Sequence, residues 1–377
     1  MRRGLLLALA AVLAGAPAAE AGPNSSQTAV VSLGDSYISG EAGRWQGNTN
    51  NPARDRDGTD RAAYDCTVAT CSYDPGRAYG ASAINGCDRS DVAEIKSAVF
   101  FVHQKVNLAC SGATTANIFR SRNGGEAFKG EPPQGDQLRY VAQALHVKVV
   151  VLSIGGNDLG FADIVQACAT AYLSAQPPCQ TSQQAVLDAA FPAAMRNVAR
   201  AIDEIRDIMR ESGYKDFRFI LQSYPSVFAR ASDNRYPEAD RAQRAGIGGC
   251  PGYDTDLTWA RDSVVSQISN GLRFVAAYKG VQFLDLRDAF EGREICSDST
   301  SQASLTQPPS ATTSEWGRFV NESTVAQGVL QESVHPNAYG QRALGRCLTL
   351  IYSSFSRGAQ STNEPGSGPD AMRLTPY

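Results

Sequence analysis

The sequence lacks the features that would assign it to several common functional classes. It has no basic run of the kind that binds nucleic acid and no acidic tail, and its formal net charge is only −3 over 377 residues. It has no Cys-x-x-Cys pair and only three histidines, so a zinc site is not indicated. No internal repeat and no linker divides the chain. We therefore expect one domain with no nucleic-acid partner, no metal and no cofactor.

Long apolar runs are also missing, with one exception at the start of the chain. Two arginines precede an apolar run at residues 5–14, and Ala19-Glu20-Ala21 matches a small-x-small cleavage site. This order is typical of a secretory signal peptide over residues 1–21. An uncleaved membrane anchor is the alternative, but the run is shorter than the roughly 20 apolar residues that span a bilayer. We expect a secreted, extracellular protein without an integral membrane segment.

Cysteine, in contrast, is well represented. In an exported chain most cysteines are expected to form disulfides. Short spacing favours pairing of Cys66 with Cys71 and of Cys168 with Cys179, and the sequence leaves the other connections open. Because the number is odd, at least one cysteine is unpaired or bridges to another chain. The nine are Cys66, Cys71, Cys87, Cys110, Cys168, Cys179, Cys250, Cys296 and Cys347.

Strand-like and helix-like segments alternate along the chain. This alternation predicts an α/β fold with a mainly parallel, five-stranded sheet between helices, as one domain over residues 22–356. Long polar loops, pinned by disulfides, are expected at residues 41–90 and 226–256, and a mobile polar tail at residues 357–377. The expected strands are 29–33, a second strand region at 98–102 and 106–108, 147–154, 217–221 and 281–286, and the expected helices are 137–145, 161–172, 183–210 with an interruption near Pro192, 257–278 and 337–355.

The first strand ends at a glycine that is followed closely by a serine, in Gly34-Asp35-Ser36. In open α/β sheets ligands bind outside the carboxyl ends of the strands, so Ser36 is well placed to act as a nucleophile. These three residue types also favour ordinary turns, so this stretch alone does not decide between a turn and a site. A serine hydroxyl needs a neighbouring base, and histidine is the usual base near neutral pH.

Of the three histidines, His335 is the best candidate for that base. His103 lies in an apolar stretch and His146 just before a buried strand, and both positions favour structural roles. His335 lies on a loop, where Pro336 sets the first turn of the following helix, although a surface cap is the alternative. Glu332, three residues upstream, is close enough to orient the imidazole, or it is a solvated loop carboxylate.

Acyl transfer also needs hydrogen-bond donors that stabilise the oxyanion of the tetrahedral intermediate. Backbone N–H groups in glycine-rich turns suit this role because the absent side chain lets the substrate approach. Gly112 and the Ser36 amide follow two expected strands, and the side-chain amide of Asn157 follows a third. Alone, Gly112 fits a plain turn and Asn157 a helix cap. Their joint placement after successive strands favours an oxyanion hole.

Four blocks of the sequence resemble, in order, those of the SGNH hydrolases, also called GDSL esterases and lipases. The sequences of residues 34–40 and 107–115 are similar to the corresponding sequences of the secreted actinobacterial esterase branch. No G-x-S-x-G elbow occurs in the sequence, which argues against an ordinary α/β-hydrolase. The blocks are Gly34-Asp35-Ser36, Cys110-Ser111-Gly112-Ala113, Gly155-Gly156-Asn157-Asp158 and His335-Pro336.

The resemblance implies a three-layer α/β/α, flavodoxin-like fold, with Ser36 as nucleophile and His335 as base. It also implies that the oxyanion donors are Ser36, Gly112 and Asn157. One position departs from the pattern, because many members have an aspartate three residues before the histidine, where this chain has Glu332. Some members of the secreted branch use a backbone carbonyl instead of an acid. Glu332 as orienting acid and a Ser–His dyad therefore both stay open.

The expected function is that of a secreted, monomeric serine esterase or lipase that hydrolyses carboxylic esters through an acyl-enzyme. Lipid and acylated glycan are both open as substrates, and transfer of the acyl group to an alcohol by the same site is an alternative. A non-catalytic protein that binds glycan or cell wall is a further alternative. Aromatic and basic residues in the segment 41–90 favour an O-acetylated polysaccharide slightly, although they also suit packing beneath a loop: Trp45, Tyr64, Tyr73, Arg77 and Tyr79.

Overall fold

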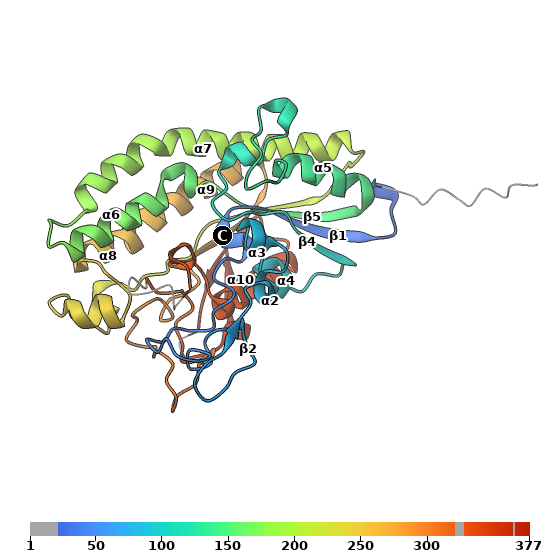
Figure 1. The fold of residues 1–377 in the computed structure, drawn as a ribbon. Coiled ribbons are helices and arrows are strands. Elements are labelled where there is room, and N and C mark those ends of the chain that lie inside the picture. Colours follow the sequence, from blue (N-terminus) through green and yellow to red (C-terminus); the bar gives the residue numbers. More distant parts are fainter. Residues whose placement is uncertain (1–21, 321–327, 365) are drawn as a thin grey trace, which may run out of the picture.

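The computed structural model describes residues 22–320, 328–364 and 366–377 as a three-layer α/β/α domain (Figure 1). The expected signal peptide, residues 1–21, lies outside the described residues. Among the described helices, none is both long and apolar enough to cross a membrane.

The central sheet has seven described strands in the order β4-β1-β5-β6-β7-β8-β9. All neighbouring pairs are parallel except β8 with β9. A separate two-stranded antiparallel ladder, β2 (Ala63–Tyr64) with β3 (Ser72–Tyr73), lies in the first polar loop. The strands of the main sheet are β1 (Thr28–Gly34), β4 (Gln104–Asn107), β5 (His146–Ser153), β6 (Arg218–Gln222), β7 (Gln282–Asp288), β8 (Gly358–Thr362) and β9 (Arg373–Pro376).

A strand forms in each of the five expected regions, although residues 98–102 are not part of β4, and two further strands correct the prediction of a mobile tail. Strand β8 pairs with β7, and β9 returns antiparallel to β8. Ala359 and Ser361 of β8 are fully buried. The segment is polar and small, so its composition resembled a tail, yet its alternating residues face the interior. Small residues at these positions can be buried even though the strand lacks the β-branched residues that are typical of the central strands.

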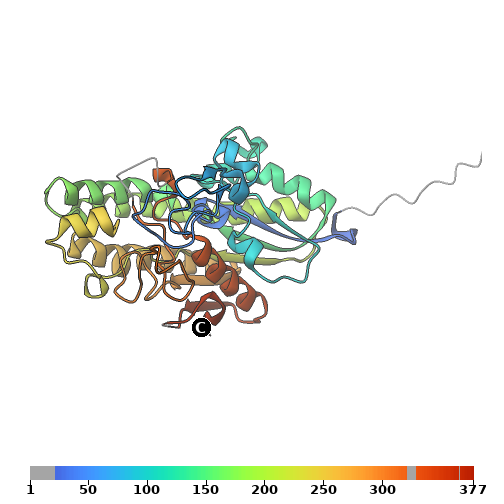
Figure 2. The same ribbon diagram turned by 60° about the horizontal axis from the view of Figure 1, so that its bottom comes forward.

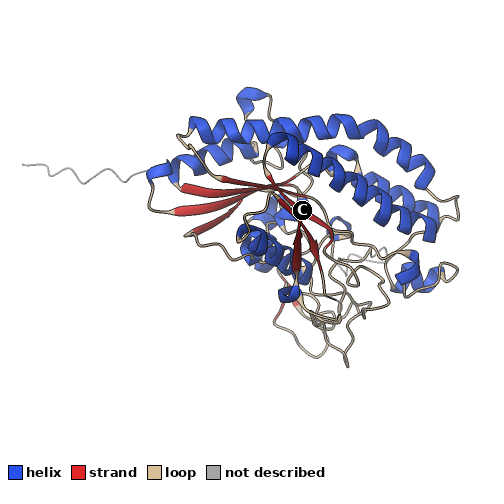
Figure 3. Cartoon of the chain, turned by 180° about the vertical axis from the view of Figure 1, so that it is seen from behind, coloured by secondary structure: helices blue, strands red, loops and turns tan. Residues whose placement is uncertain are grey.

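Helices cover both faces of the sheet (Figure 3). Helix α7 runs unbroken through Pro192, so the expected interruption there is not found. The expected helix at 257–278 is instead two α-helices, α8 and α9, joined by a π-helical stretch at residues 260–264. One face carries α5 (Gln134–Ala144), α7 (Gln180–Glu211) and α9 (Val265–Lys279), the other carries α4 (Glu94–Ser97) and α10 (Ala338–Tyr352), and α6 (Phe161–Leu173) and α8 (Asp254–Trp259) contact α7.

Three short helices lie close to the carboxyl end of the sheet or in the first polar loop. They are α1 (Ser36–Ser39), α2 (Gly76–Tyr79) and α3 (Ser82–Asn85). Figure 2 shows the first polar loop beside the later irregular segment of residues 289–320. Asn48 joins the two, because its side-chain amide donates to the carbonyl of Gly317 at 2.9 Å.

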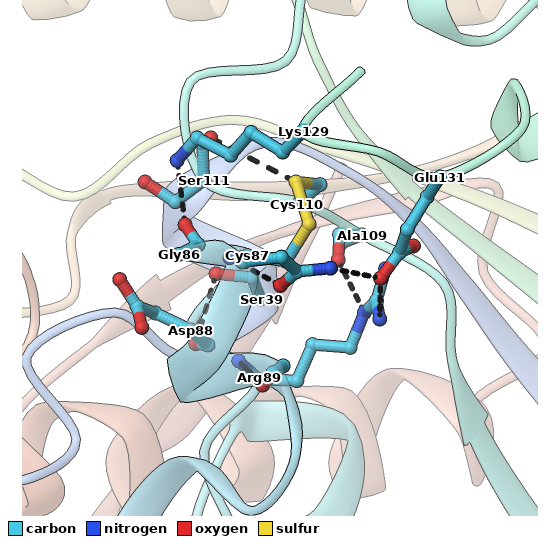
Figure 4. Close-up of a disulfide and its surroundings, with 12 residues drawn as sticks. Ser39, Gly86, Cys87, Asp88, Arg89, Ala109, Cys110, Ser111, Lys129 and Glu131 are labelled. Carbon is cyan, nitrogen blue, oxygen red and sulfur yellow. Dashed lines mark hydrogen bonds and ion pairs between the residues drawn. A yellow bond between two sulfur atoms is a disulfide. The ribbon is translucent and has the colours of Figure 1, made fainter. Parts of the chain in front are cut away.

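Four disulfides hold these long connections, and all nine cysteines lie in the described residues. The two expected pairs, Cys66–Cys71 and Cys168–Cys179, are both present. Cys250–Cys296 joins the second polar loop to the segment after β7. Cys87–Cys110 ties the first polar loop to the turn after β4 (Figure 4). The ninth cysteine, Cys347, is buried and forms no disulfide.

Deletion of residues 358–377 tests whether this segment belongs to the folded domain. We expect the free energy of unfolding to fall by more than about 3 kcal/mol, because the deletion exposes β7 and removes buried Met372. Denaturant unfolding measures the change, and Arg373→Ala, at an exposed position of β9, is the control. A truncated protein as stable as the full chain would show that the segment is a dispensable tail.

Candidate active site

The candidate nucleophile lies in a tight turn where β1 passes into α1. Gly34 has φ +142°, and a Cβ there would lie 1.9 Å from the carbonyl oxygen of Ser153 on β5. Only glycine fits this approach. Asp35 then caps α1, because its carboxylate accepts from the Tyr37 amide at 3.2 Å. The turn therefore delivers Ser36, which is nearly buried, to the carboxyl end of the sheet.

A tyrosine that lies just after β6, Tyr224, supports this cap. The Tyr224 hydroxyl donates to the second carboxylate oxygen of Asp35 at 2.5 Å and accepts from the Gly156 amide at 3.0 Å. Burial raises the pKa of Asp35 to about 7, although the bond from Tyr224 opposes the shift. Tyr224 thus joins the nucleophile turn to the glycine turn after β5.

His335 is brought to the serine by the loop before α10. Its Nε2 lies 2.7 Å from Ser36 Oγ, and its Nδ1 lies 2.8 Å from the carbonyl oxygen of Ser333. A carbonyl only accepts, so Nδ1 carries the proton and Nε2 is free to accept from the serine. Burial lowers the pKa of His335 to about 4, because desolvation disfavours the imidazolium more than the carbonyl stabilises it. Burial thus favours the neutral imidazole, with Nε2 facing Ser36 Oγ.

The loop that carries His335 is strained next to the ring. Val334 has φ +58°, a left-handed conformation that is uncommon for a β-branched residue. The Tyr37 hydroxyl donates to the Val334 carbonyl at 2.8 Å and so holds the conformation from the nucleophile turn. Such strain persists only where the surroundings determine it, and functional sites are common places for it.

Glu332 does not have the position that the sequence suggested for an orienting acid. Its buried carboxylate accepts from Trp45 Nε1 at 2.8 Å and from the Tyr79 hydroxyl at 2.6 Å. It ends a 3-10 turn at Leu330–Glu332, and the left-handed Val334 separates it from His335. The Ser333 carbonyl occupies the place beside Nδ1 instead. Of the two alternatives that the sequence left open, the geometry matches the backbone carbonyl.

The candidate oxyanion donors lie on two turns beside Ser36. Gly112 has φ +84°, and Asn157 begins a 3-10 turn after β5. The Asn157 amide donates one N–H to the Ala113 carbonyl at 2.9 Å, which leaves its second N–H for another acceptor. Both residues line the same cavity as Ser36. The structure thus brings together the serine, the histidine and the donors that the sequence proposed.

The cavity has a volume of about 1120 Å³ and is apolar over most of its surface. One face of α6, together with two residues of α9, forms the far wall, and the histidine loop contributes aliphatic side chains. Most of this wall cannot be predicted from the sequence. The helical period of apolar residues shows which side of a helix is buried, but not which other element packs against that side. The apolar lining comprises Phe161, Ala162, Val165, Ala169, Pro225, Val265, Ile268, Val320, Val329, Leu330 and Val334.

The aromatic residues that favoured a glycan do not contribute to this cavity. Trp45 and Tyr79 are buried, and their polar atoms are bound to Glu332. Arg318 lies over the Trp45 ring, with its guanidinium carbon 3.7 Å from the ring centroid. All five residues named for the glycan lie among the described residues, and none of them lines the cavity. Trp45 and Tyr79 therefore support the loops beneath the site.

Comparisons with known proteins agree with this fold. The chain is 24% identical to Lipase 1 of Streptomyces coelicolor over 342 residues, which cover 89% of this chain and 91% of that protein. It is 25% identical to a lipase of Streptomyces rimosus over 339 residues, with the same two coverages. The crystal structure of phospholipase A1 from Streptomyces albidoflavus has the same fold, with TM-score 0.50, 20% identity and coverage of 89% of this chain and 100% of that one.

The family comparison, with which these relatives agree, defines the class of the protein, a carboxylic ester hydrolase. The model of the GDSL-like Lipase/Acylhydrolase family matches residues 79–343, which is more than half of the chain. The chain belongs to this family, as the blocks around Gly112, Asn157 and His335 suggested.

Substitution of Glu332 by glutamine separates support of the loops from orientation of the histidine. Glutamine keeps one acceptor oxygen for two buried donors, so we expect the free energy of unfolding to fall by about 1–3 kcal/mol. We expect kcat/KM of the folded variant to stay within about threefold of wild type, because His335 Nδ1 is bound by a backbone carbonyl. Denaturant unfolding and ester hydrolysis measure the two effects. A loss near 10⁴-fold, as expected for removal of an orienting acid, would assign that role to Glu332.

The pH dependence of kcat/KM tests the buried, neutral state of His335. Protonated His335 cannot accept a proton from Ser36, so activity falls as the pH drops through the pKa of the free enzyme. We expect the acid limb near pH 4, below the value of about 6.5 for an unperturbed imidazole. Hydrolysis of an uncharged ester between pH 3.5 and 8, with circular dichroism to confirm the fold, measures it. A midpoint at or above 6.5 would contradict the desolvated ring.

Proposed function

We propose that this protein is an exported serine esterase or lipase that cleaves carboxylic esters with aliphatic acyl chains. The observation that carries the proposal is the 2.7 Å contact between Ser36 Oγ and His335 Nε2 at the polar end of a large apolar cavity. A polar reactive pair beside an apolar wall suits a substrate with a reactive ester and a hydrocarbon chain.

In the first half of the reaction, Ser36 Oγ attacks the ester carbonyl carbon while His335 Nε2 takes the hydroxyl proton. The carbonyl π electrons move to the oxygen and form the oxyanion of the tetrahedral intermediate. When the carbonyl re-forms, the bond to the alcohol oxygen breaks, and His335 returns its proton to that oxygen. In the second half, water attacks the acyl-Ser36 ester with the same histidine as base and then acid. The products are an alcohol and a carboxylic acid.

The other residues of the site stabilise charge as it develops. The Ser333 carbonyl accepts from Nδ1 and so stabilises the imidazolium through one hydrogen bond. The backbone N–H groups of Ser36 and Gly112 and the second side-chain N–H of Asn157 serve as donors to the oxyanion, a role supported by the place of all three residues in the lining of one cavity. This machinery is a Ser–His dyad, in which the backbone carbonyl replaces an acid.

The apolar wall favours an acyl chain over a sugar as the main recognised group. Residues Ala162, Val165 and Ala169 lie on one face of α6, and Val265 and Ile268 face them from α9. Hydrocarbon burial stabilises a bound chain by about 0.8 kcal/mol for each methylene. The lipase names of the relatives support the same substrate class.

We further propose that the protein acts outside the cell as a monomer. The signal-type segment at residues 1–21 supports export. Four disulfides suit an oxidising compartment, where they persist. Neither feature points to a nucleic-acid partner or a bound cofactor.

Hydrolysis of p-nitrophenyl esters from acetate to palmitate tests the function. We expect Ser36→Ala and His335→Ala to lose several orders of magnitude in kcat, and Asn157→Ala about 10²–10³-fold. We expect Ala169→Trp, which fills the wall, to lose long-chain activity selectively. Asp163→Trp, at an exposed position of the same helix, should leave chain preference unchanged.

Two outcomes would contradict the proposal. Full activity of Ser36→Ala would exclude the proposed nucleophile. A wild-type protein that cleaves no ester and forms no adduct with a serine-directed phosphonate would favour the non-catalytic, glycan-binding alternative. Transfer of the acyl group to an added alcohol, with the same dependence on Ser36, would identify an acyltransferase.

A further inference from the structure

A buried glutamate lies beside the proposed dyad and has no part in the mechanism above. Glu41 follows Gly40, which ends α1 in a left-handed conformation with φ +97°. The Glu41 amide donates to the Ser36 carbonyl at 3.1 Å, so the nucleophile turn fixes the position of the glutamate. Glu41 is fully buried from bulk water, and it belongs to the lining of the cavity.

The Glu41 carboxyl begins a chain of hydrogen bonds that joins three separate segments. Ser111 Oγ donates to Glu41 Oε2, and Gln331 Nε2 donates to Ser111 Oγ at 2.9 Å. Ser111 directly precedes Gly112, and Gln331 lies on the loop that carries His335. The three side chains therefore connect the nucleophile turn, the turn of residues 110–113 that carries Gly112 (the oxyanion turn) and the loop that carries His335 (the histidine loop), which are far apart in the sequence.

Other contacts also fix the oxyanion turn: the Cys110 amide donates to the Gly34 carbonyl at 3.1 Å, and the Asn157 side-chain amide donates to the Ala113 carbonyl at 2.9 Å. The disulfide Cys87–Cys110 and the bond from the Ser111 amide to the Cys87 carbonyl, at 3.1 Å, hold the turn to the first polar loop (Figure 4). None of these contacts reaches the histidine loop. Glu41 Oε2, in contrast, lies 3.8 Å from His335 Nε2 as well as against Ser111.

The surroundings of Glu41 favour its uncharged form. Burial raises the pKa of Glu41 well above its usual value, and nearby Asp88 and Glu332 raise it further, while Lys129 and the bond from Ser111 oppose the shift. Its Oε1 is buried and has no hydrogen-bond partner among the described residues. A neutral carboxyl still accepts from Ser111 and places no full charge beside Nε2, where the catalytic proton is held.

We propose that Glu41 is a positioning residue, which holds the oxyanion turn and the histidine loop in register with Ser36 through Ser111 and Gln331. This inference rests on the proposed function of Ser36 and His335. Its role is geometric: the donor at Gly112 must meet the oxyanion that forms at Ser36, and displacement of such groups by about 1 Å costs roughly 10²-fold in rate. The contact acts on the transition state rather than on binding of the acyl chain.

Kinetics of Glu41→Ala, Glu41→Gln and Ser111→Ala on one p-nitrophenyl ester test the proposal. We expect Glu41→Ala and Ser111→Ala to lower kcat about 10- to 100-fold with KM nearly unchanged, and the double variant to lose little more than either single one. We expect Glu41→Gln to stay within about threefold of wild type, because its amide oxygen still accepts from Ser111. Affinity for an alkyl boronic acid, which mimics the tetrahedral intermediate, should fall in parallel with kcat/KM.

Glu94→Gln is the matched control for the loss of a buried carboxyl. Glu94 is also fully buried, accepts from a neutral side chain, Gln222, and has one oxygen without a partner among the described residues. It lies outside the cavity lining, so its kcat should equal that of wild type. Circular dichroism and thermal unfolding confirm that each variant is folded. If Glu41→Ala does not fold, Ser111→Ala reports on the same link.

Three outcomes would overturn the proposal. Wild-type kcat in folded Glu41→Ala or Ser111→Ala would show that the link does not position the site. A loss in Glu41→Gln as large as in Glu41→Ala would show that the charge or the proton of Glu41 matters instead. A rise in KM alone would place Glu41 in substrate binding. Because Ser36→Ala is assayed in parallel, its activity shows separately whether the proposed function has failed.

Discussion

The close approach of β1 and β5 is the constraint on which the rest of the site depends. At Gly34 the two strands are so near that a side chain would overlap the Ser153 carbonyl, and the Asp35 amide donates to that same carbonyl at 3.1 Å. Gln134 closes the arrangement from α5, because its side chain bonds both the amide and the carbonyl of Gly34 at 2.7 and 2.8 Å. The chain therefore turns away from the sheet after Gly34 and places Ser36 beside the glycine turn that follows β5.

Burial of polar groups also favours the uncharged forms of the titratable side chains around Ser36. Burial raises the pKa values of Asp35 and Glu41, and it lowers the pKa of His335. All three shifts favour neutral forms, because each group loses solvation and its hydrogen bonds and neighbouring charges do not offset that loss. A neutral histidine next to a neutral carboxyl can accept the serine proton without competition from a nearby carboxylate. The cavity beyond is apolar, so the hydrogen bonds at the serine act in surroundings that weaken them little.

Glu332 shows how far sequence spacing leads toward a site. Its position three residues before His335 suggested an orienting acid, and no other feature of the sequence contradicts that interpretation. The backbone conformation contradicts this interpretation. The 3-10 turn at Leu330–Glu332 and the left-handed Val334 accompany a carboxylate that lies against Trp45 and Tyr79. Those two residues come from the first polar loop, which no local pattern ties to the histidine loop. The carboxylate therefore stabilises the packing of two loops, and the Ser333 carbonyl is the group that lies beside His335 Nδ1.

The sequence by itself determined the order of strands along the chain, the glycine at position 34, and the residue types at the ends of β1, β4 and β5. These are local properties, since a buried strand must be apolar and a close approach must be glycine. Only the tertiary structure decided that β8 completes the sheet, that α6 and α9 build the apolar wall, and that Glu41, Ser111 and Gln331 meet. Such contacts join residues tens to hundreds of positions apart, and their energy comes from packing that no single segment contains.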